Sequence, residues 1–277
     1  MSIDHAISAH YLHGNLLAEI ERALLKLGKT IDIVTISDLA PVDEFHIGGR
    51  IASKHFLEQL NLSLNDHVLD IGCGLGGAAR YVAEHYKCKV SGIDLTPEYI
   101  KTGQALCAWV KLDKLIDLQQ GNALAMPFQA NSFDRAYMMH VGMNIEDKQQ
   151  LFNDANRVLR CGAYFGIYDI MRQQNGDLSY PVPWATTSSI SKLATIDEYK
   201  NALIKAGFDI ISVTDRYDFA IDFFKQMKVK SKANGGPAPL GLHTLMQSST
   251  ALKVNNMITN LDKGLIAPIE IIAVKRC

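Results

Sequence analysis

The feature that most constrains this chain is a run of glycines between a predicted strand and a predicted helix. The segment VLDIGCGLGG (68–77) is an apolar run that ends in closely spaced glycines, and a helical pattern follows over roughly 77–86. Glycines in such a turn let the backbone approach a ligand closely and leave amide groups exposed at the start of the helix. The segment therefore predicts a strand, a ligand-binding loop and a helix.

Strands and helices alternate after this loop. Further strands are predicted at 89–94, 116–120, 134–140 and 164–170, with helices near 98–112 and 146–160 between them. Strands that alternate with helices of this length indicate βαβ units and a mostly parallel sheet. Two later segments, 208–216 and 269–276, are rich in β-branched residues and predict further strands of the same sheet.

The flanks of this core are predicted to be helical. Residues 1–60 carry apolar residues at helical spacing around a polar, irregular stretch at Asp38–Arg50, so we expect an N-terminal helical cap. Residues 61–277 would then form the ligand-binding domain. Within it, 217–264 is too long for a hairpin loop and too apolar for a linker, which predicts a helical lid inserted between two strands.

Bulk composition narrows the class of protein. The chain has 277 residues, of which 48% are hydrophobic and 21% charged, and its formal net charge is −1. This balance is typical of soluble globular proteins and argues against a broad basic surface for nucleic acid. No apolar stretch is long enough for a membrane span, and the N-terminus lacks the pattern of a signal peptide.

The cysteines favour a reducing compartment. The chain has 5 cysteines, an odd number, and none of them form a C-x-x-C pair. We therefore expect neither a disulfide framework nor a metal site, and a cytoplasmic location.

The acids around the glycine loop indicate which ligand it binds. Gly72, Gly74 and Gly77 also fit the dinucleotide pattern G-x-G-x-x-G, so the glycines alone would suit NAD. However, Asp70 lies two residues before the first glycine, where a carboxylate would oppose a pyrophosphate. S-adenosylmethionine instead carries an ammonium and a sulfonium, which a nearby acid attracts. Asp94, at the end of the next strand, is placed to take both ribose hydroxyls of either ligand.

A third strand end completes the predicted nucleoside site. Asn122 follows the strand at 116–120 and is expected to accept a hydrogen bond from the adenine amine, although a plain turn residue is an equal reading for Asn122 alone. Leu95 and Ala123 would then cover the two faces of the ring. Because Asp70 and Asp94 already indicate a nucleoside site, we favour adenine binding over a plain turn role for Asn122.

The motifs together resemble those of the class I methyltransferases. They are VLDIGCGLGG, GIDLTPEYI, GNALAMPF, SFDRAYMMHVGMNI and NRVLRCGAYFGIYD, in that order over about residues 66–170. The resemblance implies a doubly wound α/β fold with a seven-stranded, mostly parallel sheet whose last strand is antiparallel, and S-adenosylmethionine as the methyl donor. One departure is Asn122, where many members have Asp.

The flanking segments resemble one branch of that family. DEFHIGG (43–49), YPVPWA (180–185) and the C-terminal region are similar to the sarcosine/dimethylglycine methyltransferases, with phosphoethanolamine and quinone methyltransferases as wider relatives. In that group a Gly-Gly pair closes over the methionine end of the donor. The residues that we expect to bind the cofactor are Ile47, Gly48, Gly49, Asp70, Gly72, Gly74, Asp94, Leu95, Asn122, Ala123 and Met139.

Methyl transfer from a sulfonium requires that the acceptor be held in line with the methyl group and that water be excluded from the site. It requires neither a metal nor a covalent nucleophile, so no metal site is expected. His140 lies just past the strand that faces the donor methyl and is the candidate for proton removal, with a structural histidine bonded to backbone as an equal reading. Asn144, Tyr168 and Trp184 are the candidate substrate contacts, and aromatic rings would suit an alkylated amine.

The expected partner is a small-molecule methyl acceptor, preferably an amine of the glycine, sarcosine or dimethylglycine type. A carbon or oxygen acceptor on a quinone precursor, terpenoid or polyketide is the main alternative, since the predicted lid is apolar. A non-catalytic S-adenosylmethionine-binding protein and an NAD-dependent oxidoreductase are alternatives of other classes. Neither nucleic acid nor membrane is expected as a partner, and a homodimer stays open.

Overall fold

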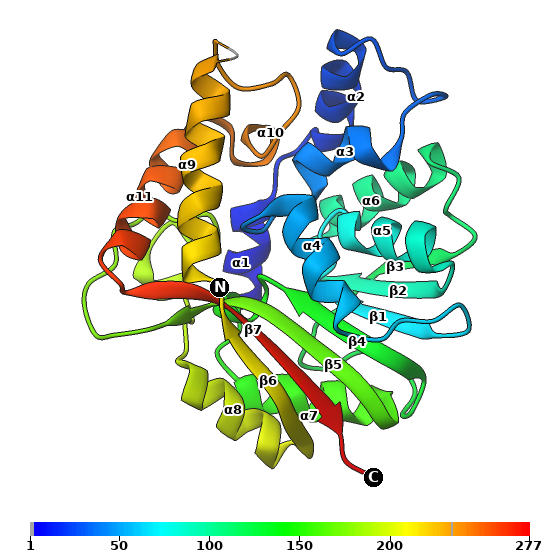
Figure 1. The fold of residues 1–277 in the computed structure, drawn as a ribbon. Helices are drawn as coiled ribbons and strands as arrows, with labels where there is room; N and C mark the ends of the chain where they lie inside the picture. The colour runs from blue at the N-terminus through cyan, green and yellow to red at the C-terminus, as the bar shows by residue number, and fades with distance from the viewer. Residues whose placement is uncertain (1–2, 234) are drawn as a thin grey trace.

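The computed structural model describes residues 3–233 and 235–277, and its centre is a 7-stranded sheet in the order β3-β2-β1-β4-β5-β7-β6 (Figure 1). The strands are β1 (His67–Ile71), β2 (Lys89–Asp94), β3 (Ile116–Gln120), β4 (Phe133–Met139), β5 (Leu159–Arg172), β6 (Phe208–Asp215) and β7 (Ile266–Lys275). β1 to β5 pair in parallel, whereas β7 is antiparallel to both β5 and β6. The predicted fold class, including its antiparallel last strand, is confirmed.

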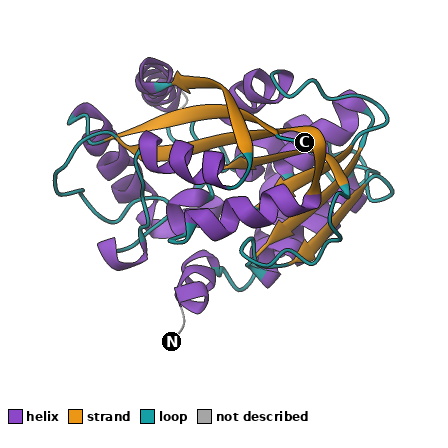
Figure 2. Cartoon of the chain, turned by 90° about the horizontal axis from the view of Figure 1, so that it is seen from below, coloured by secondary structure: helices purple, strands orange, loops and turns teal. Residues whose placement is uncertain are grey.

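Helices cover both faces of the sheet (Figure 2). On one face lie α4 (Gly49–Glu58), α5 (Gly77–Tyr86) and α6 (Pro97–Trp109), and on the other lie α7 (Lys148–Val158) and α8 (Ile196–Lys205). Neighbouring residues of β1 alternate between these layers: Val68 packs with the first set of helices and Leu69 with the second. This alternation follows from the two-residue period of a strand, and both faces are buried because parallel sheets need cover on each side.

The N-terminal helices lie above the carboxyl ends of the strands. They are α1 (Ile3–Tyr11), α2 (Leu16–Lys26) and α3 (Ile36–Asp43), and α2 and α3 share a buried cluster with α6. The expectation of an irregular stretch from Asp38 was wrong, because α3 continues through Pro41 to Asp43. Its start is stabilised by a capping box in which the Thr35 hydroxyl accepts from the Asp38 amide and the Asp38 carboxylate accepts from the Thr35 amide.

The predicted lid is helical and lies between β6 and β7 in the sequence, as expected. It contains α9 (Tyr217–Ala233), α10 (His243–Met246) and α11 (Thr250–Asp262), and Figure 1 shows α9 and α11 side by side above the sheet. Short 3-10 turns are η1 (Gly142–Asn144), η2 (Ser188–Ile190) and η3 (Gln247–Ser249). Throughout the residues that the model describes, no helix has both the length and the apolar character needed to cross a membrane.

A disulfide joins Cys161 to Cys277, so the expectation that the cysteines form no such bond was wrong for this pair. The two cysteines are 116 residues apart in sequence, but β5 and β7 are antiparallel neighbours. Continuing the register outward from the Tyr164–Val274 pair brings Cys161 opposite Cys277, with 4.9 Å between their α-carbons. This distance is in the range that a disulfide spans. Cys73, Cys88 and Cys107 are free and buried.

The contact between α4 and the sheet gives a test of how firmly the N-terminal helices are coupled to the core. Phe56 is fully buried among core residues, whereas Ile51 on the same helix is 67% exposed. We expect Phe56→Ala to lower the free energy of unfolding by about 3–4 kcal/mol, because it leaves a cavity. Ile51→Ala should change the free energy of unfolding by less than about 0.5 kcal/mol. Denaturant unfolding followed by circular dichroism measures both, and equal effects would contradict the packing described here.

Candidate active site

A cavity of about 470 Å³ lies at the carboxyl ends of β1 to β4. Its lining comes from the loops that follow these strands, from the N-terminal segment and from Leu245 of the lid. In open α/β sheets ligands bind at this edge, because the loops between strands and helices converge there. The cavity is therefore the candidate binding site.

The glycine loop forms the floor of this cavity. Gly72 and Gly74 both line it, with φ angles of +73° and +53° that favour glycine. A side chain at Gly72 would also be only 2.4 Å from Val141, so the loop can approach the neighbouring strand end closely. The predicted positions of both glycines at the ligand site are in accord with this geometry.

Asp94 lies at the end of β2 with its carboxylate in the cavity lining. One oxygen accepts from the Gly74 amide at 3.0 Å and the other from the Thr96 amide at 2.8 Å. Burial raises the pKa of this carboxyl, although the hydrogen bonds from Thr96 and Gly74 act in the opposite direction. The two amides fix the carboxylate while it retains accepting capacity for a ligand hydroxyl.

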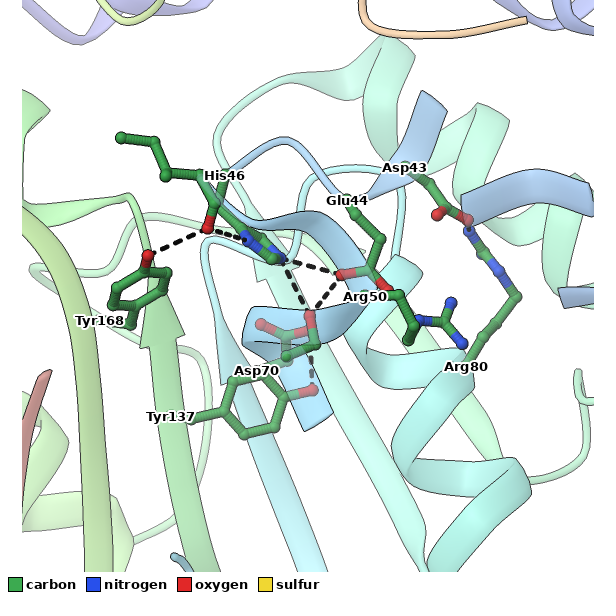
Figure 3. A network of polar contacts seen from close by, with 10 residues as sticks. Asp43, Glu44, His46, Arg50, Asp70, Arg80, Tyr137 and Tyr168 are labelled. Carbon is green, nitrogen blue, oxygen red and sulfur yellow. Dashed lines mark hydrogen bonds and ion pairs between the residues drawn. The ribbon is translucent and has the colours of Figure 1, made fainter. Parts of the chain in front are cut away.

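Asp70 is a buried acid at the end of β1. It is 3% exposed, and its carboxylate accepts a hydrogen bond from the Tyr137 hydroxyl at 3.0 Å (Figure 3). Burial raises the pKa of Asp70 to about 8, against the effect of the Tyr137 hydrogen bond, and the charges of Asp94 and Glu44 raise it further. A group in this state gains most from a cationic ligand, which would favour its ionised form.

Asp43 adds a third acid to the cavity wall, and its position was not predicted from the sequence. Its Oδ2 forms an ion pair with Arg80, and both side chains are fully buried (Figure 3). Its Oδ1 is buried without a hydrogen-bond partner among the described residues. One oxygen of this carboxylate is thus committed to Arg80 and the other is available beside the cavity.

The lining of the cavity is strongly acidic. Asp43, Asp70 and Asp94 lie along it, with Glu146 and Asp147 further out, and no Lys or Arg is among the described residues that line it. A pyrophosphate would be repelled by this arrangement, whereas an ammonium or sulfonium would be attracted. The electrostatics therefore suit a cationic nucleoside better than a dinucleotide.

Leu95, Asn122 and Ala123 all line the same cavity, beyond Asp94. The side-chain oxygen of Asn122 accepts from the Leu124 amide at 2.9 Å, which orders the loop after β3. An sp² oxygen has a second lone pair, so this turn role and the predicted contact with an adenine amine are compatible. Met139 also lines the cavity, at the end of β4.

A second, smaller cavity of about 80 Å³ adjoins the first one. Tyr11, Phe45, His46 and His140 line both, so the cavities meet at these side chains. The remaining lining is apolar or aromatic: Ile47, Met143, Pro183, Trp184, Phe223, Phe224, Met227, Leu242, Met246, Val254 and Met257. This is a water-excluding compartment built largely from the lid.

His140 lies at the junction of the two cavities. Its backbone has a φ of +57°, and its amide donates to the Tyr168 carbonyl at 2.7 Å. The ring, in contrast, leaves Nε2 buried without a hydrogen-bond partner among the described residues. Burial and the charge of His46 lower its pKa well below 6.5, so the ring is neutral and can accept a proton. If His140 were a structural histidine bonded to backbone through its ring, Nε2 would not be expected to lack a hydrogen-bond partner among the described residues.

The three predicted substrate contacts differ in position. Trp184 lines the second cavity, with its indole N–H donated to the Ser191 hydroxyl at 2.9 Å, so it offers an apolar ring. Asn144 lines the first cavity, but its amide is engaged: Oδ1 accepts from the Tyr11 hydroxyl at 3.0 Å and Nδ2 donates to the Trp184 carbonyl at 2.9 Å. Asn144 therefore orients the cavity walls.

Tyr168 does not lie where the sequence led us to expect it. It lines neither cavity, and its hydroxyl donates to the Ile47 carbonyl at 3.0 Å. The reason is the two-residue period of β5, which directs this side chain toward α4 and the segment before it. Its role in the structure is to hold the chain around Ile47.

The Gly-Gly segment is also placed differently from the prediction. Ile47 lines the second cavity, whereas Gly48 and Gly49 line neither. Gly48 has a φ of +94°, and a Cβ there would be 2.5 Å from the Phe219 ring. The close approach that Gly48 permits in this structure is thus to the lid helix α9.

Residues from the N-terminal segment complete the site, and sequence reasoning missed most of them. Tyr11, Phe45 and His46 reach the junction from α1 and from the segment after α3. No local pattern marks them, because they meet the strand ends only through tertiary packing. Phe45 and His46 lie within the DEFHIGG segment (43–49), and this resemblance was the available signal for them, whereas Tyr11 lies in another part of the sequence.

Comparison with known families agrees with this site. Residues 69–167 match the family described as methyltransferase domain. This segment runs from β1 through most of β5 and contains the glycine loop, Asp70, Asp94 and His140. The match confirms the resemblance to class I methyltransferases that the motifs indicated.

Curated relatives are methyltransferases with diverse acceptors. The chain is 27% identical to the methyltransferase GfsG of Streptomyces halstedii, over 64% of this chain and 65% of that protein. It is 26% identical to the (+)-O-methylkolavelool synthase of Herpetosiphon aurantiacus, over 57% of this chain and 56% of that protein. It is also 26% identical to a sterol 24-C-methyltransferase of Eremothecium gossypii, over 60% of this chain and 46% of that protein. The matched region thus spans about half to two thirds of the length of these relatives.

Solved structures share the fold. A geranyl diphosphate C-methyltransferase from Streptomyces coelicolor superposes with a TM-score of 0.71 at 15% identity and covers 99% of this chain and 98% of its own. A protein from Galdieria sulphuraria, named as a candidate sarcosine dimethylglycine methyltransferase, gives 0.68 at 17% identity, with coverage of 84% and 94%. At these identities the likeness establishes the architecture alone.

The buried state of Asp70 generates a pH-dependent prediction. Its pKa of about 8 in the folded chain exceeds the ordinary 3.8, so the folded state holds this proton more tightly and stability decreases as pH rises toward 8. Asp70→Asn removes the titration. We expect the stability of the variant relative to wild type to increase by about 3 kcal/mol from pH 6 to pH 9. Urea unfolding across this range measures the difference, and a difference independent of pH would contradict the assignment.

Proposed function

Because residues 69–167 carry a methyltransferase domain, we propose that this protein transfers a methyl group from S-adenosylmethionine to a small molecule. The observation that carries the proposal is the pair of adjoining cavities. One is acidic and lies on the glycine loop, the other is apolar, and they meet at the unpartnered Nε2 of His140. Similar structures in complex with S-adenosylmethionine or S-adenosylhomocysteine support the choice of donor.

The residues of the first cavity fit this donor from end to end. Asp94 would bind the ribose hydroxyls, and Leu95, Asn122 and Ala123 would surround the adenine. Asp70 and the free oxygen of Asp43 would attract the ammonium group. When bound, S-adenosylmethionine supplies an electrophilic methyl group on a sulfonium.

Catalysis at this site consists mainly of orientation and exclusion of water. The apolar walls of the second cavity, closed by Trp184 and by α9 and α11 of the lid, would keep the acceptor dry and in line with the methyl group. His140 is placed at the meeting point and is neutral, so it can accept the proton that the acceptor loses. A metal ligand set is not required for either role.

The second cavity favours an apolar acceptor over glycine or sarcosine. A carboxylate-bearing amine needs a cation to balance its charge. No Lys or Arg occurs among the described residues of this lining, and His46, which also lines it, is already paired with the Glu44 carboxylate. Phe223, Phe224 and Met246 instead offer apolar surface, which suits the apolar part of a terpenoid, a polyketide or a prenylated ring next to its acceptor atom. The acceptor atom is then an oxygen, a carbon or an uncharged amine of such a molecule.

Binding of the donor can be tested apart from catalysis. We expect Asp94→Asn to weaken binding of S-adenosylhomocysteine by about 10- to 100-fold, because charge-assisted hydrogen bonds to the ribose are lost. The matched control is Asp117→Asn, the same change at an exposed site on β3. Isothermal titration calorimetry measures both. No binding by the wild-type chain would refute the choice of donor.

Catalysis is tested by transfer of radiolabelled methyl from S-adenosylmethionine to a panel of acceptors. The panel contains terpenoid alcohols, prenylated phenols and polyketides on one side, and glycine, sarcosine and dimethylglycine on the other. We expect incorporation with members of the first group. Turnover restricted to the second group would overturn the proposal of an apolar acceptor. Donor binding without methyl incorporation into any acceptor of the panel would favour a non-catalytic binding protein.

A charge placed at the rim of the second cavity should affect the acceptor alone. Met227 lines this cavity at 37% exposure, and Val229 on the same helix is 68% exposed and lines neither cavity. We expect Met227→Asp to raise the KM for an apolar acceptor by about tenfold or more, with donor affinity unchanged. Val229→Asp should leave the KM unchanged. Equal effects in steady-state assays of the two variants would contradict the assignment of this cavity.

A further inference from the structure

A buried polar cluster lies behind the junction of the two cavities. We define it as Glu44, His46, Arg50 and Ser53, which come from the segment after α3 and from α4. Figure 3 shows Glu44, His46 and Arg50 of this cluster. The Glu44 carboxylate accepts from Arg50 Nε, from the Ser53 hydroxyl and, at 2.9 Å, from His46 Nε2. The side chains of Glu44 and His46 are only 1% and 5% exposed. The cluster is therefore held firmly and away from solvent.

The hydrogen-bond partners of His46 define which of its nitrogens carry hydrogen. Nε2 lies 2.9 Å from a Glu44 oxygen and 3.0 Å from the Ser53 hydroxyl, which itself donates to Glu44, so both are acceptors toward Nε2. Nδ1 lies 3.4 Å from the Ile47 carbonyl, which can only accept. Acceptors at both nitrogens indicate an imidazolium, and the Glu44 carboxylate supplies the opposite charge.

Glu44 itself is suited to this role. Burial on its own would raise the pKa of its carboxyl, but the hydrogen bond and charge of His46, with Arg50 and Ser53, lower it to about 2. Arg50 is in turn stacked over the Tyr81 ring, 4.9 Å from its centroid. Glu44 is thus ionised at every pH at which the protein would work.

His46 and His140 are direct neighbours. Their ring centroids are 5.9 Å apart at an interplanar angle of 80°, and the Tyr168 ring contacts both, at 6.0 Å and 4.9 Å respectively. The ionisable residues that line the cavities together with this pair include Asp43, Asp70, Asp94, Glu146, Asp147, Tyr11 and Tyr99. Burial is the larger cause of the lowered pKa of His140, and the charge of the neighbouring His46 lowers it further.

We propose that Glu44 and Ser53 are positioning residues that hold His46 as a cation, and that this cation keeps His140 uncharged for the acceptor's proton. The inference rests on the proposed methyl transfer and assigns separate roles to the two histidines: His46 is the fixed cation and His140 accepts the proton. Two neighbouring groups whose environments separate their protonation states are a recurrent arrangement in acid–base sites. Here the separation is produced by one buried carboxylate.

The reaction balances with this assignment. A lone pair of an acceptor oxygen or nitrogen, or the π pair of an acceptor carbon, forms the bond to the methyl carbon, and the carbon–sulfur bond breaks with its electron pair left on sulfur as a neutral thioether. The acceptor's proton passes to Nε2 of His140, which was uncharged and becomes imidazolium. Because His46 next to it is charged, His140 then releases this proton readily to solvent when the site opens.

The first test needs no acceptor and no donor. Histidine ring resonances of the full-length ligand-free chain are followed by carbon–proton NMR from pH 5 to 9 in wild type, Glu44→Gln and His46→Gln. In wild type at pH 7.5 we expect the carbon and proton shifts of an imidazolium for the His46 ring, which has acceptors at both nitrogens, and those of a neutral ring for His140. In His46→Gln the midpoint of His140 should rise by roughly one to two pH units, because a unit charge 5.9 Å away is lost. In Glu44→Gln it should rise by less, because the negative charge of the carboxylate is lost together with the positive charge of His46.

Controls separate this electrostatic role from a general loss of structure. Glu58→Gln is the same change at an exposed position on α4, and His85→Gln removes an exposed histidine from α5. Neither should move the midpoint of His140. If Glu44→Gln fails to fold, His46→Gln still reports on the charge. The proposal is overturned if His46 is neutral at pH 7.5 in wild type, or if the midpoint of His140 is the same in wild type and His46→Gln.

The second test uses whichever acceptor the radiolabel panel identifies. We expect the acidic limb of the kcat profile to move to higher pH by the same amount in Glu44→Gln, with the affinity for S-adenosylhomocysteine unchanged. A residue that only supported the fold would lower kcat equally at all pH values, and that result would overturn the proposal. Absence of donor binding would instead refute the methyltransferase proposal, while the NMR result would remain valid.

Discussion

The buried ion pair between Asp43 and Arg80 is the interaction on which the rest of the site depends. It joins the end of α3, in the N-terminal cap, to α5, which begins at the glycine loop. Arg80 also donates to the Leu75 carbonyl at 2.8 Å, so the same guanidinium binds the glycine loop itself. If one partner were removed, the remaining buried charge would lower the free energy of unfolding by several kcal/mol. The cap and the loop are consequently restricted to one relative position.

This restriction explains how a segment remote in sequence reaches the reacting groups. The chain that leaves Asp43 brings His46 to the junction of the two cavities within three residues, and Glu44 lies behind it, bonded to His46. Gly77 permits the contact, because a Cβ there would lie 2.4 Å from the Asp43 carbonyl oxygen. The acids of the first cavity, the histidines at the junction and the apolar lid thus form one continuous site, although they come from three separate parts of the chain.

Most of the fold was predictable because its signals are local. The strands at β2 and β3 and the helix α5 agree with their predicted bounds, since apolar runs, glycines and caps act over a few residues. The cofactor residues at strand ends were predictable for the same reason: Asp70 and Asp94 follow directly from where a parallel strand stops. Errors arose where a long-range partner decides the outcome. Cys161 and Cys277 meet only through strand register, and Tyr168 bonds to Ile47, which is 121 residues away.

By itself, the sequence determined the alternation of strands and helices, the glycine loop and the acids Asp70 and Asp94 that line the first cavity. These depend on backbone propensity, side-chain period and charge, which are properties of short segments. Only the tertiary structure decided which side chains surround the second cavity and which histidine is charged. Those outcomes depend on burial and on hydrogen-bond partners supplied from distant segments. The unpartnered nitrogen of His140 and the carboxylate behind His46 are consequences of packing that no local pattern encodes.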